Sequence, residues 1–350
     1  MIGLVCFGKA VAIVTLSVFV IGLASLRTQS ELDVEPRSQE RHPVVLPADT
    51  LLAIGDLHGD LEQGYAALKL AGLVNRNDRW SGGQATLVQT GDLLDRGPKS
   101  IELVQLFERL KGEAAAAGGA VHTLMGNHET MNLLGDYRYV SQEELAALGS
   151  LRKPPPLTLE AALHAGQASW RRHMQEDVGS VLRQRPVAVM LGQGTCKSLF
   201  IHAGLPLQLM LEVAQQASSF EPDILLEKLN TLVQGAVQNC SEGRCTKYQG
   251  DLLTGGNSPV WYRGYVQDYE AKLCPEVQQV VQNLKVQRIV SGHNIMQNGK
   301  IRSLCGGRVT LIDVGMSHAY FGNMAVWKCS NNSAYALYPS QTAGLRAPDL

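Results

Sequence analysis

The chain has 350 residues, and its 31 lysines and arginines are balanced by 32 aspartates and glutamates. This balance leaves no excess of positive charge for neutralising phosphate backbones, so it excludes general nucleic-acid binding and predicts no nucleic-acid partner. A hydrophobic fraction of 45% excludes a disordered chain and predicts a globular protein with a large apolar core.

The N-terminal region is predicted to direct the protein to a membrane system. Residues 1–26 carry Lys9 as their single charge, and the apolar stretch 10–26 suits a signal peptide or a short signal anchor. Residues 27–48 are polar, contain three prolines and predict a tether. We therefore expect a protein of the secretory pathway or endoplasmic reticulum, either lumenal or attached to the membrane through residues 10–26. A mitochondrial or plastid envelope location is the alternative.

The cysteines beyond this leader are even in number, which permits disulfides in an oxidising compartment. They are Cys196, Cys240, Cys245, Cys274, Cys305 and Cys329. Cys240 and Cys245 are the obvious local pair, whereas scattered reduced thiols are equally compatible with the sequence alone.

The first half of the folded domain, which we expect over 49–329, shows a repeated pattern. Short apolar runs at 50–54, 85–90 and 120–124 each end in a polar turn that contains glycine, which predicts buried strands. Amphipathic stretches at 60–71 and 99–111 predict helices between them. Right-handed crossovers of this kind give parallel strands, and ligands bind at the carboxyl ends of such strands.

The second half changes character and then returns to strands. Residues 130–185 favour helices alone and are interpreted as a helical insertion over the site. Helices are also expected at 222–238 and at 275–285, where Pro275 suits a first helical position. The polar residues 330–350 predict a loosely held tail. Further strands are expected at 188–191, 198–202, 287–290, 309–314 and 325–328. The predicted fold class is α/β, with two sheets packed face to face and flanked by helices.

The first polar turn places two metal-binding side chains close together. Asp56 and His58 follow the first strand in the sequence GDLHGD. A carboxylate beside an imidazole suits Mn, Fe or Zn better than Ca or Mg. On its own this pair is a weak signal, because most such pairs are ordinary surface residues.

The second polar turn, GDLLDRG, supplies Asp92, Asp95 and Arg96. A carboxylate can bridge two cations about 3.5–4 Å apart, and Asp92, equivalent in position to Asp56, is the candidate bridge. The planar guanidinium of Arg96 suits phosphate oxygens. A surface cluster of ion pairs is the alternative for this turn in isolation.

The third polar turn, GNHE, places Asn127 beside His128. The side-chain carbonyl of Asn127 can bind a metal ion, and His128 can stand clear of the metal and give a proton to a leaving group. Asp95 can hold the second ring nitrogen of His128 and keep it protonated.

Three later residues complete the candidate site. His202 and His293 each follow an apolar run and have a glycine nearby, as in the first three turns. Gly204 lies two residues after His202, and Gly292 directly precedes His293. Arg263 lies in the aromatic segment PVWYRGY. It is either a second phosphate-binding group or a cation stacked on Trp261.

The combination of these motifs resembles the calcineurin-like metallophosphoesterases, and within them the phosphoprotein phosphatase branch. GDLHGD, GDLLDRG, GNHE and SGH match that branch over about residues 50 to 328, whereas its HGG motif is replaced by His202-Ala203-Gly204. GDLHGD, WYRGY and IDVGMS together are similar to the Shewanella-like protein phosphatases. The resemblance implies a β-sandwich flanked by helices, in agreement with the predicted strand order.

The resemblance also implies a role for each candidate residue. One metal ion would be bound by Asp56, His58 and Asp92, and the other by Asp92, Asn127, His202 and His293. His128 with Asp95 would donate the proton, and Arg96 with Arg263 would bind phosphate. The implied cofactors are two divalent or trivalent ions of Mn, Fe or Zn.

The function implied is that of a phosphoprotein phosphatase. It would hydrolyse phosphate monoesters of serine, threonine or tyrosine in a phosphorylated protein, by a hydroxide that two metal ions activate. A dinucleoside polyphosphate hydrolase or another phosphodiesterase is the first alternative, because such enzymes share the core motifs. A catalytically silent binding scaffold is the second alternative, and the complete set of ligand positions argues against it. No regulatory partner is indicated by the sequence.

Overall fold

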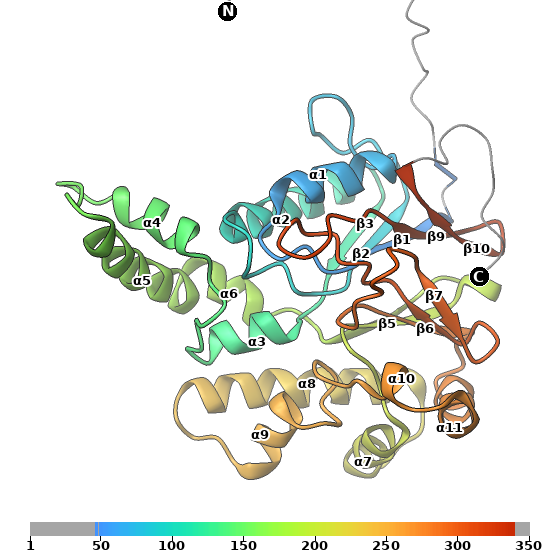
Figure 1. The fold of residues 1–350 in the computed structure, drawn as a ribbon. Coiled ribbons are helices and arrows are strands. Elements are labelled where there is room, and N and C mark those ends of the chain that lie inside the picture. Colours follow the sequence, from blue (N-terminus) through green and yellow to red (C-terminus); the bar gives the residue numbers. More distant parts are fainter. Residues whose placement is uncertain (1–45, 48, 340–350) are drawn as a thin grey trace, which may run out of the picture. The chain divides into compact units, whose positions relative to one another are not determined.

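The computed structural model describes residues 46–47 and 49–339 (Figure 1). Within this part of the chain, ten strands form two mixed sheets of five strands each. The first sheet has the order β10-β9-β1-β2-β3, with bounds Ser333–Leu337, Val326–Ser330, Leu51–Ile54, Thr86–Gln89 and Ala120–Thr123. The second sheet has the order β4-β5-β6-β8-β7, with bounds Ala188–Leu191, Ser198–Ile201, Arg288–Ser291, Val309–Leu311 and Arg302–Leu304.

Each sheet contains three parallel strands, and these bring the polar turns together. β1, β2 and β3 run parallel and are joined through α1 (Leu61–Leu70) and α2 (Ser100–Ala116). β5, β6 and β8 are parallel to one another in the second sheet. Parallel strands end at one edge of their sheet, so the turns that follow them can share one site.

The two sheets pack face to face over an apolar core. Phe200 of β5 and Trp327 of β9 are both fully buried, and their rings meet edge to face with centroids 5.5 Å apart. The Cys196–Cys329 disulfide links β9 of the first sheet to the turn just before β5 of the second. This packing is the α/β arrangement predicted from the order of strands and helices.

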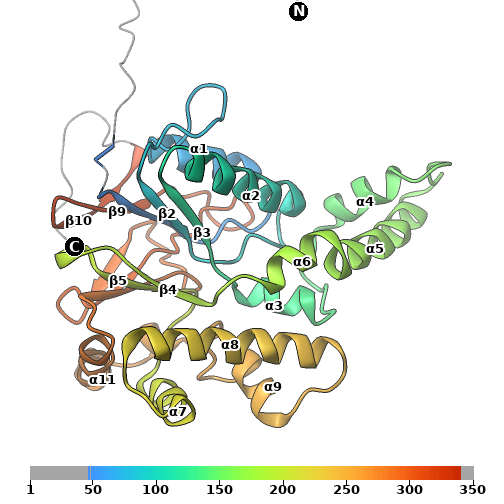
Figure 2. The ribbon, with the colours of Figure 1, turned by 180° about the vertical axis from the view of Figure 1, so that it is seen from behind.

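Helices cover the outer faces of both sheets. α1 and α2 lie over the first sheet, and α7, α8 and α11 lie along the second sheet on the opposite side of the fold (Figures 1 and 2). The bounds of these and the neighbouring helices are α7 Leu207–Ala217, α8 Pro222–Ser241, α9 Lys247–Thr254, α10 Gly264–Gln267 and α11 Glu270–Asn283. A 3-10 turn, Gly194–Cys196, precedes β5.

The segment 130–185 is helical, but it lies beside the site rather than over it. Its helices are α3 Asn127–Leu133, α4 Gln142–Ser150, α5 Leu159–Gln175 and α6 Asp177–Arg183. α4 and α5 extend away from the sheets as a pair (Figures 1 and 2). They pack on each other because Gly149 and Gly166 let the helices approach until a β-carbon would meet the facing backbone. Tyr139 is the one residue of this segment that lines the central cavity.

Two boundary predictions are wrong for physical reasons. α11 begins at Glu270, so Pro275 lies inside the helix, where its exposed position leaves the carbonyl of Ala271 open to water. The tail predicted from 330 instead contains β10, which pairs with β9 and alternates buried Ala334 and Ala336 with the half-buried Tyr335. The polar residues on either side of this short strand hid its pattern.

The six cysteines beyond the leader form three disulfides. They are Cys196–Cys329, the local pair Cys240–Cys245, and Cys274–Cys305, which links α11 to the turn between β7 and β8. These disulfides suggest an oxidising compartment outside the cytoplasm. Among the described residues no helix is long and apolar enough to cross a membrane. The predicted leader at 1–26 and most of the tether at 27–48 lie outside the described residues.

Candidate functional site

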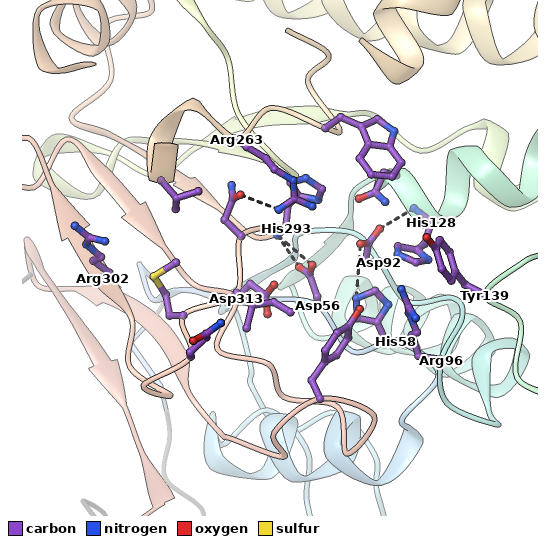
Figure 3. A pocket seen from close by; sticks show the side chains of 18 of the residues that line it. Asp56, His58, Asp92, Arg96, His128, Tyr139, Arg263, His293, Arg302 and Asp313 are labelled. Carbon is purple, nitrogen blue, oxygen red and sulfur yellow. Dashed lines mark hydrogen bonds and ion pairs between the residues drawn. The ribbon is translucent and has the colours of Figure 1, made fainter. Parts of the chain in front are cut away.

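The polar turns meet at a cavity of about 680 Å³ between the ends of the two sheets (Figure 3). Eight of the ten side chains predicted for the site line this cavity: Asp56, His58, Asp92, Arg96, Asn127, His128, Arg263 and His293. The other two, Asp95 and His202, are fully buried behind it and contact His128 and Asp92. The structure therefore brings all ten together.

Asp92 lies at the centre of the cluster. Its Oδ2 atom is 3.4 Å from Nε2 of His202 and 3.8 Å from Nε2 of His58. Its Oδ1 atom accepts a hydrogen bond of 2.9 Å from the backbone N–H of His128. Two groups of three side chains have ligand atoms within 4.8 Å of one another, His58–Asp92–His128 and Asp92–His202–His293. Because the groups share Asp92, its carboxylate can bridge two ions.

The backbone around Asp92 is held in a strained conformation. Asp92 has a φ of 57°, a left-handed value that is uncommon for residues other than glycine. Glu129 holds it there by accepting bonds of 2.8 Å from the N–H groups of both Asp92 and Leu93. Gly126 is required beside it, because a β-carbon at that position would collide with the Asp92 carboxylate. Such strain is typical of functional sites.

The histidine orientations fit bound cations. Nδ1 of His58 lies 3.2 Å from the carbonyl of Leu94, and Nδ1 of His202 lies 2.8 Å from that of Thr90. Each Nδ1 therefore carries the proton, and each Nε2 directs its lone pair toward Asp92, as metal-binding histidines do. Nε2 of His202 also faces Oδ1 of Asn127 at 2.9 Å, so electron-rich atoms converge on one point.

Two further observations also indicate that this cluster binds cations. Nε2 of His293 is buried and has no hydrogen-bond partner, although buried polar atoms normally have one. Burial lowers the pKa of His202, but the attraction of Asp92 outweighs it and raises the pKa overall. The cluster thus favours positive charge beside Asp92, and the donor set of imidazole, carboxylate and amide oxygen fits Mn, Fe or Zn.

Asp56 and Asp313 add negative charge to the cluster. Asp56 lines the same cavity, is not a member of the two groups of three, and accepts a bond of 3.0 Å from the backbone N–H of His293. Burial, Asp313 and Asp92 raise its pKa well above the ordinary value. Burial also raises the pKa of Asp313 to about 6. Multivalent cations would relieve this crowding of buried carboxylates.

A chain of hydrogen bonds fixes the ring of His128. Nδ1 of His128 lies 2.6 Å from Oδ2 of Asp95, and the other Asp95 oxygen accepts a bond of 3.0 Å from Nδ2 of Asn132. The indole N–H of Trp170, a fully buried residue of α5, donates to Oδ1 of Asn132 at 2.8 Å. Burial lowers the pKa of His128, but Asp92 and Asp95 outweigh it and raise the pKa overall. A proton is therefore available at this imidazole.

We expect Trp170→Phe to lower kcat about tenfold, the scale at which supporting residues of a metal site affect activity. Without the indole N–H, the amide of Asn132 is free to turn its oxygen toward Asp95, which disturbs the orientation of His128. The loss should be larger for an alkyl phosphate such as phosphoserine than for an aryl phosphate, because the alkoxide depends more on protonation.

Trp80→Phe is the matched control, since the half-buried Trp80 donates its indole N–H to the carbonyl of Gly83 at 3.0 Å, away from the cavity. Equal losses on both substrates, or an equal loss in the Trp80 variant, would mean that Trp170 affects stability alone.

The two arginines lie on different sides of the cluster. The guanidinium of Arg96 stacks on the half-buried Tyr139 ring, 3.9 Å from its centroid. Nη1 of Arg263 donates to Oδ1 of Asn294 at 3.3 Å. The cation–π contacts of the described residues do not include Arg263 on Trp261, whose ring instead meets His293 edge to face. Both guanidinium groups line the cavity, where they can bind anionic oxygens.

No role was predicted from the sequence for several residues that shape the site, although two of them lie within the motifs GNHE and IDVGMS: Glu129, Asn132, Tyr139, Trp170 and Asp313. Asp313 follows a β-branched strand and precedes a glycine two residues later, so the pattern used for the other turns could have found it. Asn132 and Trp170 carry no such local signal, because their contact depends on how α5 packs.

Comparison with known proteins defines the class of protein. Residues 50–296 match the profile of the calcineurin-like phosphoesterases. The chain belongs to this family, and with its buried histidine–aspartate clusters it is a metal-dependent phosphoesterase.

Among its relatives is Shewanella-like protein phosphatase 2 of Arabidopsis thaliana, which is 33% identical over 300 residues, covering 77% of this chain and 72% of the relative. A symmetrical bis(5'-nucleosyl)-tetraphosphatase of Photorhabdus laumondii is 29% identical over 166 residues, covering 47% of this chain and 48% of the relative. The crystal structure of a cold-active protein-tyrosine phosphatase of a psychrophilic Shewanella species has the same fold. It gives a TM-score of 0.61 at 24% identity, and the match covers 83% of this chain and 80% of that one.

Proposed function

We propose that the protein is a phosphoprotein phosphatase that hydrolyses phosphate monoesters of serine, threonine or tyrosine. The observation that carries this proposal is the hydrogen bond of 2.6 Å between His128 and Asp95 beside the cluster centred on Asp92. Hydrolysis of a phosphate monoester releases an alkoxide or phenoxide, and a protonated imidazole at this position can protonate it. The proposed partner is a phosphorylated protein.

The residues that would hold two ions of Mn, Fe or Zn are those that the family resemblance implies, and the donor atoms gathered around Asp92 support the assignment. Asp56, His58 and Asp92 would hold one ion. Asp92, Asn127, His202 and His293 would hold the other. When bound, such a pair of ions lowers the pKa of water toward neutrality and polarises phosphoryl oxygens.

Three further side chains of the cavity, those of Arg96, Arg263 and His128, would act on the substrate itself. Arg96, fixed on Tyr139, and Arg263, fixed on Asn294, would bind the phosphoryl oxygens and offset the charge that develops on them. His128 would give the proton at Nε2 to the departing oxygen, while Asp95 stabilises the imidazolium through Nδ1. No cysteine thiol takes part, since the six cysteines beyond the leader are paired.

The test is release of phosphate from matched phosphoserine, phosphothreonine and phosphotyrosine peptides, with diadenosine tetraphosphate as the competing substrate. The protein is stripped with a chelator and resupplied separately with Mn²⁺, Fe²⁺ or Zn²⁺. We expect peptide turnover that requires metal and identifies the preferred phosphorylated residue. Turnover of the dinucleotide alone would assign the protein to the nucleotide hydrolases. Metal binding without turnover of any substrate would favour the binding scaffold.

A further inference from the structure

Arg302 lines an end of the cavity. It has no role in the proposed binding of metal ions or in the proposed binding of phosphate by Arg96 and Arg263. It begins β7, its side chain is exposed and lines the cavity, and it forms no ion pair with any described residue. Figure 3 shows Arg302 and Arg96 at opposite ends of the site, with Asp56 and Asp313 between them.

The charges that line the cavity are divided between its floor and its walls. Every carboxylate of the lining, namely Asp56, Asp92 and Asp313, is buried at the cluster. The wall between the cluster and Arg302 is formed by Ile295–Asn298, with the Met296 side chain buried and two neutral amides exposed. Arg302 is therefore an unneutralised cation at the end of an uncharged wall, which is a suitable position for a second anionic group.

The sheet limits how far the backbone at Arg302 lies from the backbone at Asp313. Arg302 pairs with Leu311 of β8, and that strand leads directly to Asp313. A cross-strand pair spans roughly 5 Å and two extended residues roughly 7 Å, so the Cα atoms of Arg302 and Asp313 are at most about 12 Å apart. An extended peptide advances about 3.3–3.6 Å per residue, so this backbone distance corresponds to about four residues.

We propose that Arg302 forms a subsite for an acidic side chain within about four residues of the phosphorylated residue of a peptide substrate. This inference rests on the proposed phosphoprotein phosphatase function. It adds a substrate class, namely phosphorylated segments with a nearby carboxylate. The subsite acts on binding, because Arg302 lies on the opposite side of the cluster from His128 (Figure 3).

The test scans one glutamate through each position from four residues before to four residues after the phosphorylated residue of an otherwise neutral peptide. The full chain with Mn²⁺ is compared with Arg302→Gln, Arg302→Glu and the control Arg76→Gln. Arg76→Gln changes the net charge by the same amount as Arg302→Gln. Because Arg76 is exposed and outside the cavity, its replacement leaves the cavity unchanged.

We expect one position at which glutamate raises kcat/KM about two- to fivefold through KM, the scale of an exposed ion pair. Arg302→Gln should abolish this gain, Arg76→Gln should keep it, and Arg302→Glu should prefer lysine at the same position.

The result that overturns the subsite is peptide turnover without a positional preference, or a preference that survives Arg302→Gln. Hydrolysis of 4-nitrophenyl phosphate by all variants shows that each folds and binds metal. Turnover of this small substrate by the wild type without turnover of any phosphopeptide would overturn the proposed function, and the subsite with it. Turnover of diadenosine tetraphosphate that is sensitive to Arg302→Gln would assign Arg302 to a polyphosphate chain instead.

Discussion

Asp92→Asn is expected to lower kcat at least about a thousandfold and to reduce the metal content of the purified protein. Asp92 is the residue common to both groups of potential ligands, and its Oδ2 atom faces Nε2 of both His58 and His202. Asparagine retains an oxygen that can accept the bond from the His128 backbone, but it loses the negative charge that holds two cations together. Metal ions stabilise the transition state by several kcal/mol, and the loss of that stabilisation lowers kcat by about a thousandfold.

The measurement combines kcat at saturating Mn²⁺ with metal content by mass spectrometry. Asp60→Asn is the matched control, because Asp60 is also buried and lies in the same motif as Asp56, but its Oδ1 atom caps α1 by accepting a bond of 3.0 Å from Gln63. Asparagine is an equally good N-cap, although its amide loses the bond of 2.8 Å that Oδ2 of Asp60 accepts from the backbone N–H of His318, so this variant should lose some stability but keep its metal and most of its activity. Full metal content with normal kcat in the Asp92 variant would remove Asp92 from the ligand set.

The central part of the site was predictable because its signals are local. Asp95 follows β2 and His128 follows β3, and these strands are parallel neighbours, so their turns emerge at the same edge. The pattern of apolar run, glycine and polar side chain therefore predicts proximity without any knowledge of distant contacts. The structure confirms the proximity with the distance of 2.6 Å between these two side chains.

The supporting residues were not predictable, because their contacts arise from packing between remote segments. Trp170 reaches Asn132 because α5 packs beside α3, and nothing near Trp170 in sequence indicates that arrangement. Arg302 is similar, since its place at the cavity depends on β7 pairing with β8 across the end of the second sheet. Residues of this kind are determined by register and by helix orientation, which a short motif does not encode.

His128→Asn is expected to show whether His128 donates a proton or binds a metal ion, since the geometry is compatible with both roles. Its ring is within reach of His58 and Asp92, in a group that could hold a metal ion, but its Nδ1 atom is also bound to Asp95. As a proton donor it should contribute about 10²- to 10⁴-fold to hydrolysis of a phosphoserine peptide. The same variant should lose much less activity on 4-nitrophenyl phosphate, because nitrophenolate leaves readily without a proton. Metal content should remain that of the wild type.

The opposite outcome has an equally definite interpretation. If His128 is a metal ligand, the variant should lose metal, and both substrates should fall by the same factor. Asp95→Asn extends the test, because it keeps the size of the side chain but removes the charge that stabilises the imidazolium. It should therefore show the same dependence on leaving group, to a smaller extent. His122→Asn on β3 is the control, since His122 is half-buried and outside the cavity, and it should leave both substrates unaffected. A dependence on leaving group that appears in the His128 and Asp95 variants and is absent from the His122 variant would establish proton donation by His128.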